Sequence, residues 1–131
     1  MTDVVAVILM VGITAYALFG GADFGAGFWD LTAGGAERGR DPRSVITHSI
    51  GPVWEANHVW LIFCLVVLWT AFSEAFASIT LTLFVPLSIA ALGIVFRGSA
   101  FAFRKEVTRT SSQRNFGAAF ATSSVIVPFC M

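Results

Sequence analysis

Charged residues are scarce in this sequence. Asp, Glu, Lys and Arg make up 12% of its 131 residues, whereas about 25% is usual in soluble globular domains. Hydrophobic residues make up 56%, and 13 residues are Phe. This balance argues against an ordinary soluble domain and favours a protein whose surface faces lipid.

The sequence also lacks a net charge and has few cysteines. Its formal net charge is zero, which removes any global electrostatic argument for a nucleic-acid partner. The two cysteines, Cys64 and Cys130, both lie inside apolar runs. We therefore expect two buried thiols rather than a disulfide framework.

No basic residue precedes the first apolar run, Val4–Leu18, which follows Asp3. A secretory signal peptide would carry positive charge there and a small-residue cleavage site behind it. The small residues Gly20–Ala22 are followed at once by Asp23. We therefore expect a retained first transmembrane helix.

Four apolar segments stand out, and we predict helices over about residues 4–29, 52–72, 79–103 and 115–131. A helix needs roughly 20 apolar residues to cross the ~30 Å hydrocarbon core. The first three segments meet that length, whereas the fourth stops within an apolar run. The prediction is one all-α integral membrane domain, a transmembrane helix bundle with three full spanning helices and a truncated fourth.

The start of the second helix is open to two interpretations. Pro52 suits the first turn of a helix, so the helix starts there after Gly51. If residues 44–50 are also helical, Pro52 instead kinks one longer helix.

Positive charge is confined to two connections. All eight Lys and Arg residues lie in or beside Gly34–Arg43 and Arg104–Arg114, and none lies at the N-terminus or in the predicted turn Ser73–Ser78. The positive-inside rule then places loops 34–50 and 104–114 in the cytoplasm and the N-terminus outside.

The first apolar segment carries carboxylates at membrane depth. One helical stripe, with spacings of 3, 4 and 3, contains Gly20, Asp23, Gly27 and Asp30. The glycines indicate tight helix packing, as does the neighbouring G-x-x-x-G pair Gly21 and Gly25. A carboxylate inside a span is costly and usually faces a partner or a water-filled path, which makes Asp23 a functional candidate. Asp30 is either solvated among headgroups or functional.

Glu55 and His58 share one face of the second segment. Glu-x-x-His motifs hold di-iron centres in helical bundles, but only with a second motif and further carboxylates, and the sequence has no second motif. We therefore expect no metal here. His58 is either a neutral, hydrogen-bonded side chain or a group that exchanges protons near neutral pH.

Arg97 follows the third apolar run by one turn. Either its side chain extends to the interface, or it forms a structural ion pair with Asp23 or Glu55. The predicted topology collects the candidate residues, Asp23, Asp30, Glu55, His58 and Arg97, at the cytoplasmic end of the bundle. A carboxylate cluster with an arginine there is what proton entry from the cytoplasm requires.

Four stretches resemble, in order and spacing, subunit II of the cytochrome bd-type quinol oxidases: GADFGAGFWDLTAGG, HSIGPVWEANHVWLIF, FRGSAFAFRKE and FGAAFATSSVIVPF. The resemblance covers nearly the whole chain, over the N-terminal half of a subunit of about eight spanning helices. It implies a bacterial inner-membrane, multi-pass protein of the respiratory chain.

The resemblance also implies a partner and an activity. The haem-bearing large subunit would carry the b- and d-type haems, and the complex would oxidise quinol, reduce dioxygen and take protons from the cytoplasm electrogenically. This chain would bind no haem, would contact membrane lipids and would not be catalytically competent alone. By position, Glu55 would belong to the proton path with Asp23, Asp30 and His58, and Arg97 would form a structural ion pair.

Two rival interpretations stay open at this point. A fragment of a membrane transporter or channel would use the acidic cluster as an ion site and would carry ion flux without oxygen consumption. A purely structural membrane subunit would only pair its buried charges with one another.

Overall fold

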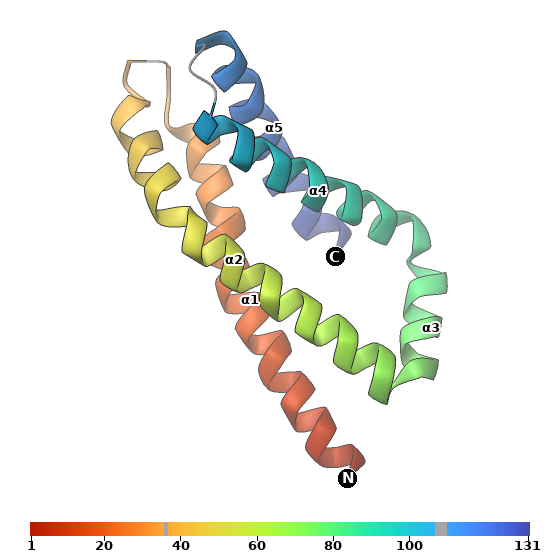
Figure 1. Cartoon of the computed structure of the whole chain (residues 1–131). Helices are drawn as coiled ribbons and strands as arrows, with labels where there is room; N and C mark the ends of the chain where they lie inside the picture. The colour runs from red at the N-terminus through yellow and green to blue at the C-terminus, as the bar shows by residue number, and fades with distance from the viewer. Residues whose placement is uncertain (36, 107–109) are drawn as a thin grey trace. The chain divides into compact units, whose positions relative to one another are not determined.

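The described part of the chain is helical in a computed structural model that covers residues 1–35, 37–106 and 110–131. The helices are α1 (Thr2–Thr32), α2 (Arg40–Ala71), α3 (Ser73–Thr82), α4 (Phe84–Glu106) and α5 (Thr110–Cys130) (Figure 1). No strand occurs within those ranges, and the predicted all-α class is confirmed. Residues 36 and 107–109, in the two predicted basic loops, lie outside the described residues.

Two helices, α1 and α2, are long and apolar enough to cross a membrane. Among the described residues, a third candidate span is obtained when α3 and residues Phe84–Ala100 of α4 are counted as one span with a break at Leu83. Residues Gly117–Cys130 of α5 form a shorter apolar helix. This pattern agrees with a membrane helix bundle of up to three spans.

The helix predicted from residue 52 begins at Arg40 instead, with Pro52 inside it. Of the two interpretations of Pro52, the longer helix is the one that forms. Proline removes one backbone hydrogen bond, here the one to the carbonyl of His48. Helices in membranes tolerate such a loss because neighbouring groups and local adjustments satisfy the backbone.

The helix predicted over residues 79–103 is divided in two, because the chain bends at Leu83, where α3 has ended at Thr82. Pro86 explains the position of this break. It has no N–H to donate to the carbonyl four residues earlier, which is that of Thr82. Pro86 is well placed in the first turn of α4, where no such bond is needed.

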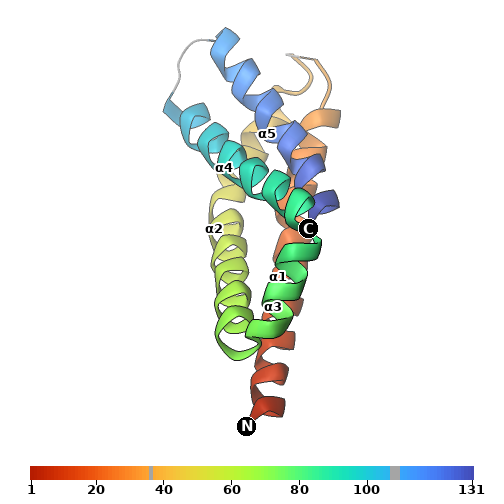
Figure 2. The same cartoon turned by 90° about the vertical axis from the view of Figure 1, so that its right-hand side faces the viewer.

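The predicted turn over residues 73–78 is helical as well. The turn itself is at Phe72, where the backbone leaves helical geometry with φ of −133° and ψ of 51°. Figures 1 and 2 both show the chain reversing direction between α2 and α3.

The chain forms two compact units. The first comprises Met1–Asp23 and Ser49–Phe84, and the second comprises Phe24–His48 and Val85–Met131. Inside the first unit α1 approaches α2 at Gly12, where an added Cβ would lie 2.8 Å from the Phe63 ring. Glycine is therefore the residue that permits this approach.

The second unit packs α5 against both α4 and the end of α1. An added Cβ at Gly93 of α4 would lie 2.5 Å from Val127 of α5, and one at Gly27 of α1 would overlap Ser124 of α5. Figure 2 shows α5 beside α4. Among the described residues of this unit, the buried apolar ones are four aliphatic residues and one aromatic residue: Ala90, Ala100, Ala121, Val127 and Phe120.

The polar stripe predicted on α1 is buried. Gly20, Asp23, Gly27 and Asp30 all lie inside the protein, so the helical spacing identified the packed face correctly. The neighbouring Gly21 and Gly25 are different, because a Cβ added to either would meet nothing within 4 Å. Their role in packing against another helix stays a prediction.

Candidate functional site

Six polar residues in the described part of the chain are almost completely buried; two of them, Ser123 and Ser124, are serines of α5 that bond within their own helix, and the other four carry an amide or a charge. Asp23, Asp30, Asn57 and Arg97 expose 2%, 4%, 4% and 1% of their surface. A buried polar group costs free energy unless it is hydrogen-bonded, and a buried charge costs more. The contacts of these four residues are therefore the first place to look for function.

Asp23 is held by a residue of the next helix. The side-chain amide of Asn57 donates a hydrogen bond from Nδ2 to Oδ2 of Asp23 over 3.0 Å. Both residues belong to the first unit. A hydrogen bond to a carboxylate fixes its rotamer. The oxygen of the amide, Asn57 Oδ1, accepts no hydrogen bond from any residue that the structure describes.

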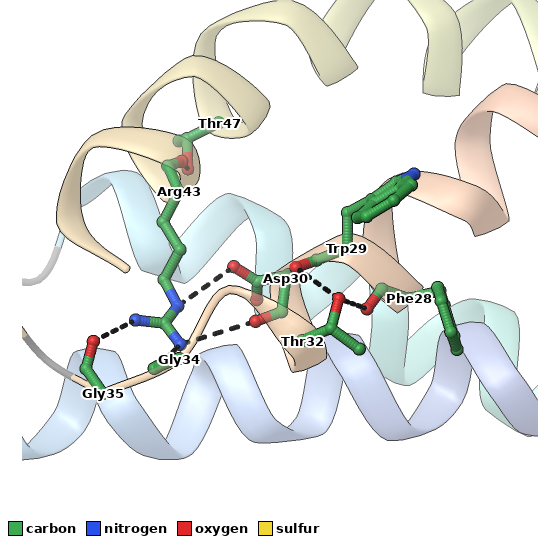
Figure 3. A network of polar contacts seen from close by, with 8 residues as sticks. All are labelled: Phe28, Trp29, Asp30, Thr32, Gly34, Gly35, Arg43 and Thr47. Atoms are coloured by element: carbon green, nitrogen blue, oxygen red, sulfur yellow. Dashed lines mark hydrogen bonds and ion pairs between the residues drawn. The ribbon is translucent and has the colours of Figure 1, made fainter. Parts of the chain in front are cut away.

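Asp30 lies against Arg43 at the connection between α1 and α2 (Figure 3). Arg43 Nε is 3.5 Å from Asp30 Oδ1. The same guanidinium donates from Nη2 to the carbonyl of Gly34 over 2.6 Å and from Nη1 to that of Gly35 over 3.3 Å. A cation here satisfies carbonyls at the end of α1 and complements the negative end of its dipole.

The glycines of this connection fit the arrangement. Gly34 has φ of +89°, a left-handed conformation that costs glycine little. Gly39 is buried, and a Cβ added to it would overlap the Arg43 guanidinium. Asp30 thus takes part in closing the connection, which supports a structural role beside the predicted one in proton transfer.

Arg97 of α4 lies close to two aromatic rings. Its Cζ is 4.7 Å from the ring centroid of Phe24 and 4.6 Å from that of Phe120. All three residues belong to the second unit. Guanidinium groups stack on aromatic faces and are more weakly hydrated than ammonium groups, which makes such a site a favourable one for a buried cation. The predicted ion pair of Arg97 stays a prediction.

Glu55 has a different environment, because its side chain is exposed on α2. Among the residues that the structure describes, it makes no hydrogen bond or ion pair. Its neighbours one and two turns on, Val59 and Ile62, are exposed as well. Glu55 therefore lies on the exposed face of α2, and the next residues along that face are the apolar Val59 and Ile62.

His58 is half-buried, and its ring stacks on that of Trp54, with centroids 5.9 Å apart and planes 12° apart. The other histidine, His48, is exposed, and its Nδ1 lies 2.8 Å from the carbonyl oxygen of Ser44. Within the described ranges, no three His, Cys, Asp or Glu side chains are placed to hold a metal ion. The sequence predicted that Glu55 and His58 share one face of the helix. In the structure Glu55 is exposed, whereas the half-buried ring of His58 contacts Trp54.

Sequence reasoning missed the partners of the buried charges: Asn57, Arg43, Phe24 and Phe120. One signal was available for Asn57, since an amide in an apolar helix usually hydrogen-bonds to another helix. Arg43 was counted only as one of several loop cations. Nothing in the spacing indicated which aromatic residues enclose Arg97.

Long apolar helices with carboxylates and an arginine buried between them define an α-helical integral membrane protein with a polar interior. The chain belongs to the cytochrome bd terminal oxidase subunit II family, which it matches over residues 1–131. The resemblance noted in the sequence is thereby confirmed.

One curated relative is subunit 2 of cytochrome bd ubiquinol oxidase from Bacillus subtilis (strain 168). The two sequences are 30% identical over 125 residues, which cover 95% of this chain and 36% of that protein. The chain thus spans about a third of the length of this relative. No solved structure matches the chain significantly.

Proposed function

We propose that the chain acts in the bacterial plasma membrane as part of the non-haem subunit of a terminal quinol:dioxygen oxidoreductase. In this role it supports a haem-bearing large subunit, which holds the b- and d-type haems, and it contributes to proton uptake from the cytoplasm. The complex turns over electrogenically, with quinol and dioxygen as substrates. The observation that carries the proposal is the family match over residues 1–131.

We assign the proton path to Glu55, Asp23, Asp30 and His58, and the role rests on the carboxylates of α1 and α2. Asp23 is buried and hydrogen-bonded, whereas Glu55 is exposed between apolar neighbours. An ionisable group on an apolar face of a spanning helix is costly when it faces lipid and is retained where it serves a partner or a water path. Glu55 then faces the large subunit and exchanges protons with it.

Replacement of Glu55 in the complete complex tests this role. Glu55→Gln keeps the size of the side chain and removes the titratable group, so oxygen uptake should fall at least about tenfold while the haem spectrum is unchanged. Glu55→Asp should retain most of the activity, because the carboxylate survives with a shorter reach. The matched control is Glu74→Gln, which removes an exposed carboxylate in the first turn of α3.

Equal oxygen uptake by Glu55→Gln and the unchanged complex at every pH would refute the proton-path role and leave a structural one. Copurification with a large subunit, followed by an optical haem spectrum, tests the assignment to an oxidase itself. A chain that copurifies without haem and drives ion flux would instead support the transporter alternative.

A further inference from the structure

The hydrogen bond between Asn57 and Asp23 joins α2 to α1 inside the first unit. Asn57 Nδ2 and Asp23 Oδ2 are 3.0 Å apart, and both side chains are more than nine-tenths buried. The donor is an amide, which cannot take up a proton at physiological pH. It can hold the carboxylate in one orientation without competing with it for protons.

The other half of the amide is an acceptor. Asn57 Oδ1 is buried and receives no hydrogen bond from the described residues. A buried acceptor that stays unsatisfied is destabilising, and in proteins such a group is commonly satisfied by an internal water with two to four polar partners. Asn57 Oδ1 thus offers an acceptor to such a water, on the same amide that holds the Asp23 carboxylate.

Asn57 and Glu55 lie on different sides of α2. Two residues along a helix correspond to a rotation of roughly 200°, so Asn57 is on the buried side of α2 and Glu55 on the exposed side. Asp23 and Glu55, two of the carboxylates proposed for proton transfer, thus differ in access. Asp23 is the inner one, and it needs a hydrogen-bonded carrier to receive protons.

We propose that Asn57 is a positioning residue of the proton path: its Nδ2 fixes the Asp23 carboxylate, and its Oδ1 binds the water that delivers protons to Asp23. This inference rests on the proposed function. The bound water takes up an excess proton, gives one proton to a carboxylate oxygen of Asp23 and remains as neutral water. Asp23 returns to the carboxylate form when the proton moves on.

Two substitutions in the complete complex test the inference. Asn57→Leu keeps the approximate size of the side chain and removes both the donor and the acceptor. We expect oxygen uptake to fall about tenfold, the factor that corresponds to loss of one charge-assisted hydrogen bond, with a larger H₂O/D₂O rate ratio and an unchanged haem spectrum. Asn57→Ser, which keeps a hydroxyl and leaves space for water, should restore the rate to within about threefold of the original.

The matched control is Ser123→Ala. It removes another buried polar group, whose hydroxyl donates to the carbonyl of Phe120 in its own helix over 2.9 Å. We expect this variant to leave both the rate and the isotope ratio unchanged.

Two outcomes would overturn the inference. Unchanged uptake and isotope ratio in Asn57→Leu would show that Asp23 receives protons without the amide. Loss of the haem spectrum in both Asn57 variants would show that the amide only holds the helices together. Glu55→Gln in the same preparations tests the proposed function separately. If Glu55→Gln slows oxygen uptake and Asn57→Leu does not, only the role of Asn57 fails. If Glu55→Gln leaves oxygen uptake unchanged, the proton path itself fails.

Discussion

Arg97 illustrates how a cation is accommodated among apolar helices. Its guanidinium lies within 5 Å of the ring centroids of Phe24 and Phe120, and the residue is 1% exposed. The flat guanidinium can stack on both rings, whereas a lysine ammonium is a compact, strongly hydrated charge. The site therefore selects for the shape of arginine as well as for its charge.

We expect Arg97→Lys to destabilise the protein although the charge is kept. The loss should be roughly 1–2 kcal/mol, the size of one or two desolvated cation–π contacts. Thermal unfolding in detergent micelles would measure it. The matched control is Arg40→Lys at an exposed position, and equal stability of the two variants would show that the rings contribute nothing specific.

At the scale of single residues, the sequence predicted the buried face of α1 better than it predicted what that face contacts. The expectation of two buried thiols was wrong, because Cys64 and Cys130 are both only half-buried. The spacing of Asp23 and Asp30 placed both on the packed face of α1, because helical periodicity is a local property. Their hydrogen-bonding partners, Asn57 and Arg43, depend on how far each helix is rotated toward its neighbour. The spacing of residues along one helix does not show how far that helix is rotated toward the next.

At the scale of helices, close approach depends on glycines whose environments differ. Gly27 and Gly21 lie in the same helix, but only a Cβ at Gly27 would overlap another side chain, that of Ser124. We expect Gly27→Ala to destabilise the protein by about 1–3 kcal/mol, as overpacking does. Gly21→Ala should change stability by less than about 1 kcal/mol, because its Cβ has space and alanine favours helix.

Thermal unfolding of the two variants would separate these expectations. Ser124→Gly, combined with Gly27→Ala, should recover most of the loss, because it removes the overlapping atoms. A Gly27→Ala variant as stable as Gly21→Ala would contradict the packing of α1 against α5.

The connection between α1 and α2 is held together by Arg43. We expect Arg43→Gln to accelerate hydrogen exchange at the amide of Gly39, which donates to the carbonyl of Gly35 over 2.8 Å. Loss of the charge-assisted bonds should allow this turn to open about tenfold more often. Exchange followed by mass spectrometry would detect the change, and Arg38→Gln, at an exposed position, serves as the control. Equal exchange in both variants would mean that Arg43 does not restrain the connection.

The sequence predicted the number of apolar segments more accurately than their ends. Pro52 and Pro86 have opposite outcomes: α2 continues through the first, and the chain breaks before the second. Proline removes the same backbone hydrogen bond at both sites, so a proline alone does not decide whether a helix ends. Local patterns do not contain that information.

At the scale of the whole molecule, the confinement of basic residues to two connections predicts its orientation in the membrane. We expect Glu37→Cys to be modified by an impermeant maleimide only from the cytoplasmic side and Glu74→Cys only from the outside. Both positions are exposed, and the native Cys64 and Cys130 would first be replaced by alanine. Labelling of intact spheroplasts and of inverted vesicles would distinguish the two sides. The reverse pattern would invert the orientation and with it the source of the protons.

The break between α3 and α4 at Leu83 restricts the depth in the bilayer at which this part of the polypeptide can lie. Backbone groups that a helix break leaves without intrahelical partners are not tolerated against hydrocarbon. The backbone around Leu83 must therefore lie at the level of the lipid headgroups or be covered by other protein. If Leu83 lies at the headgroups, a thicker bilayer would require the neighbouring spans to become more upright. The break would then couple the tilt of these helices to the thickness of the surrounding lipid.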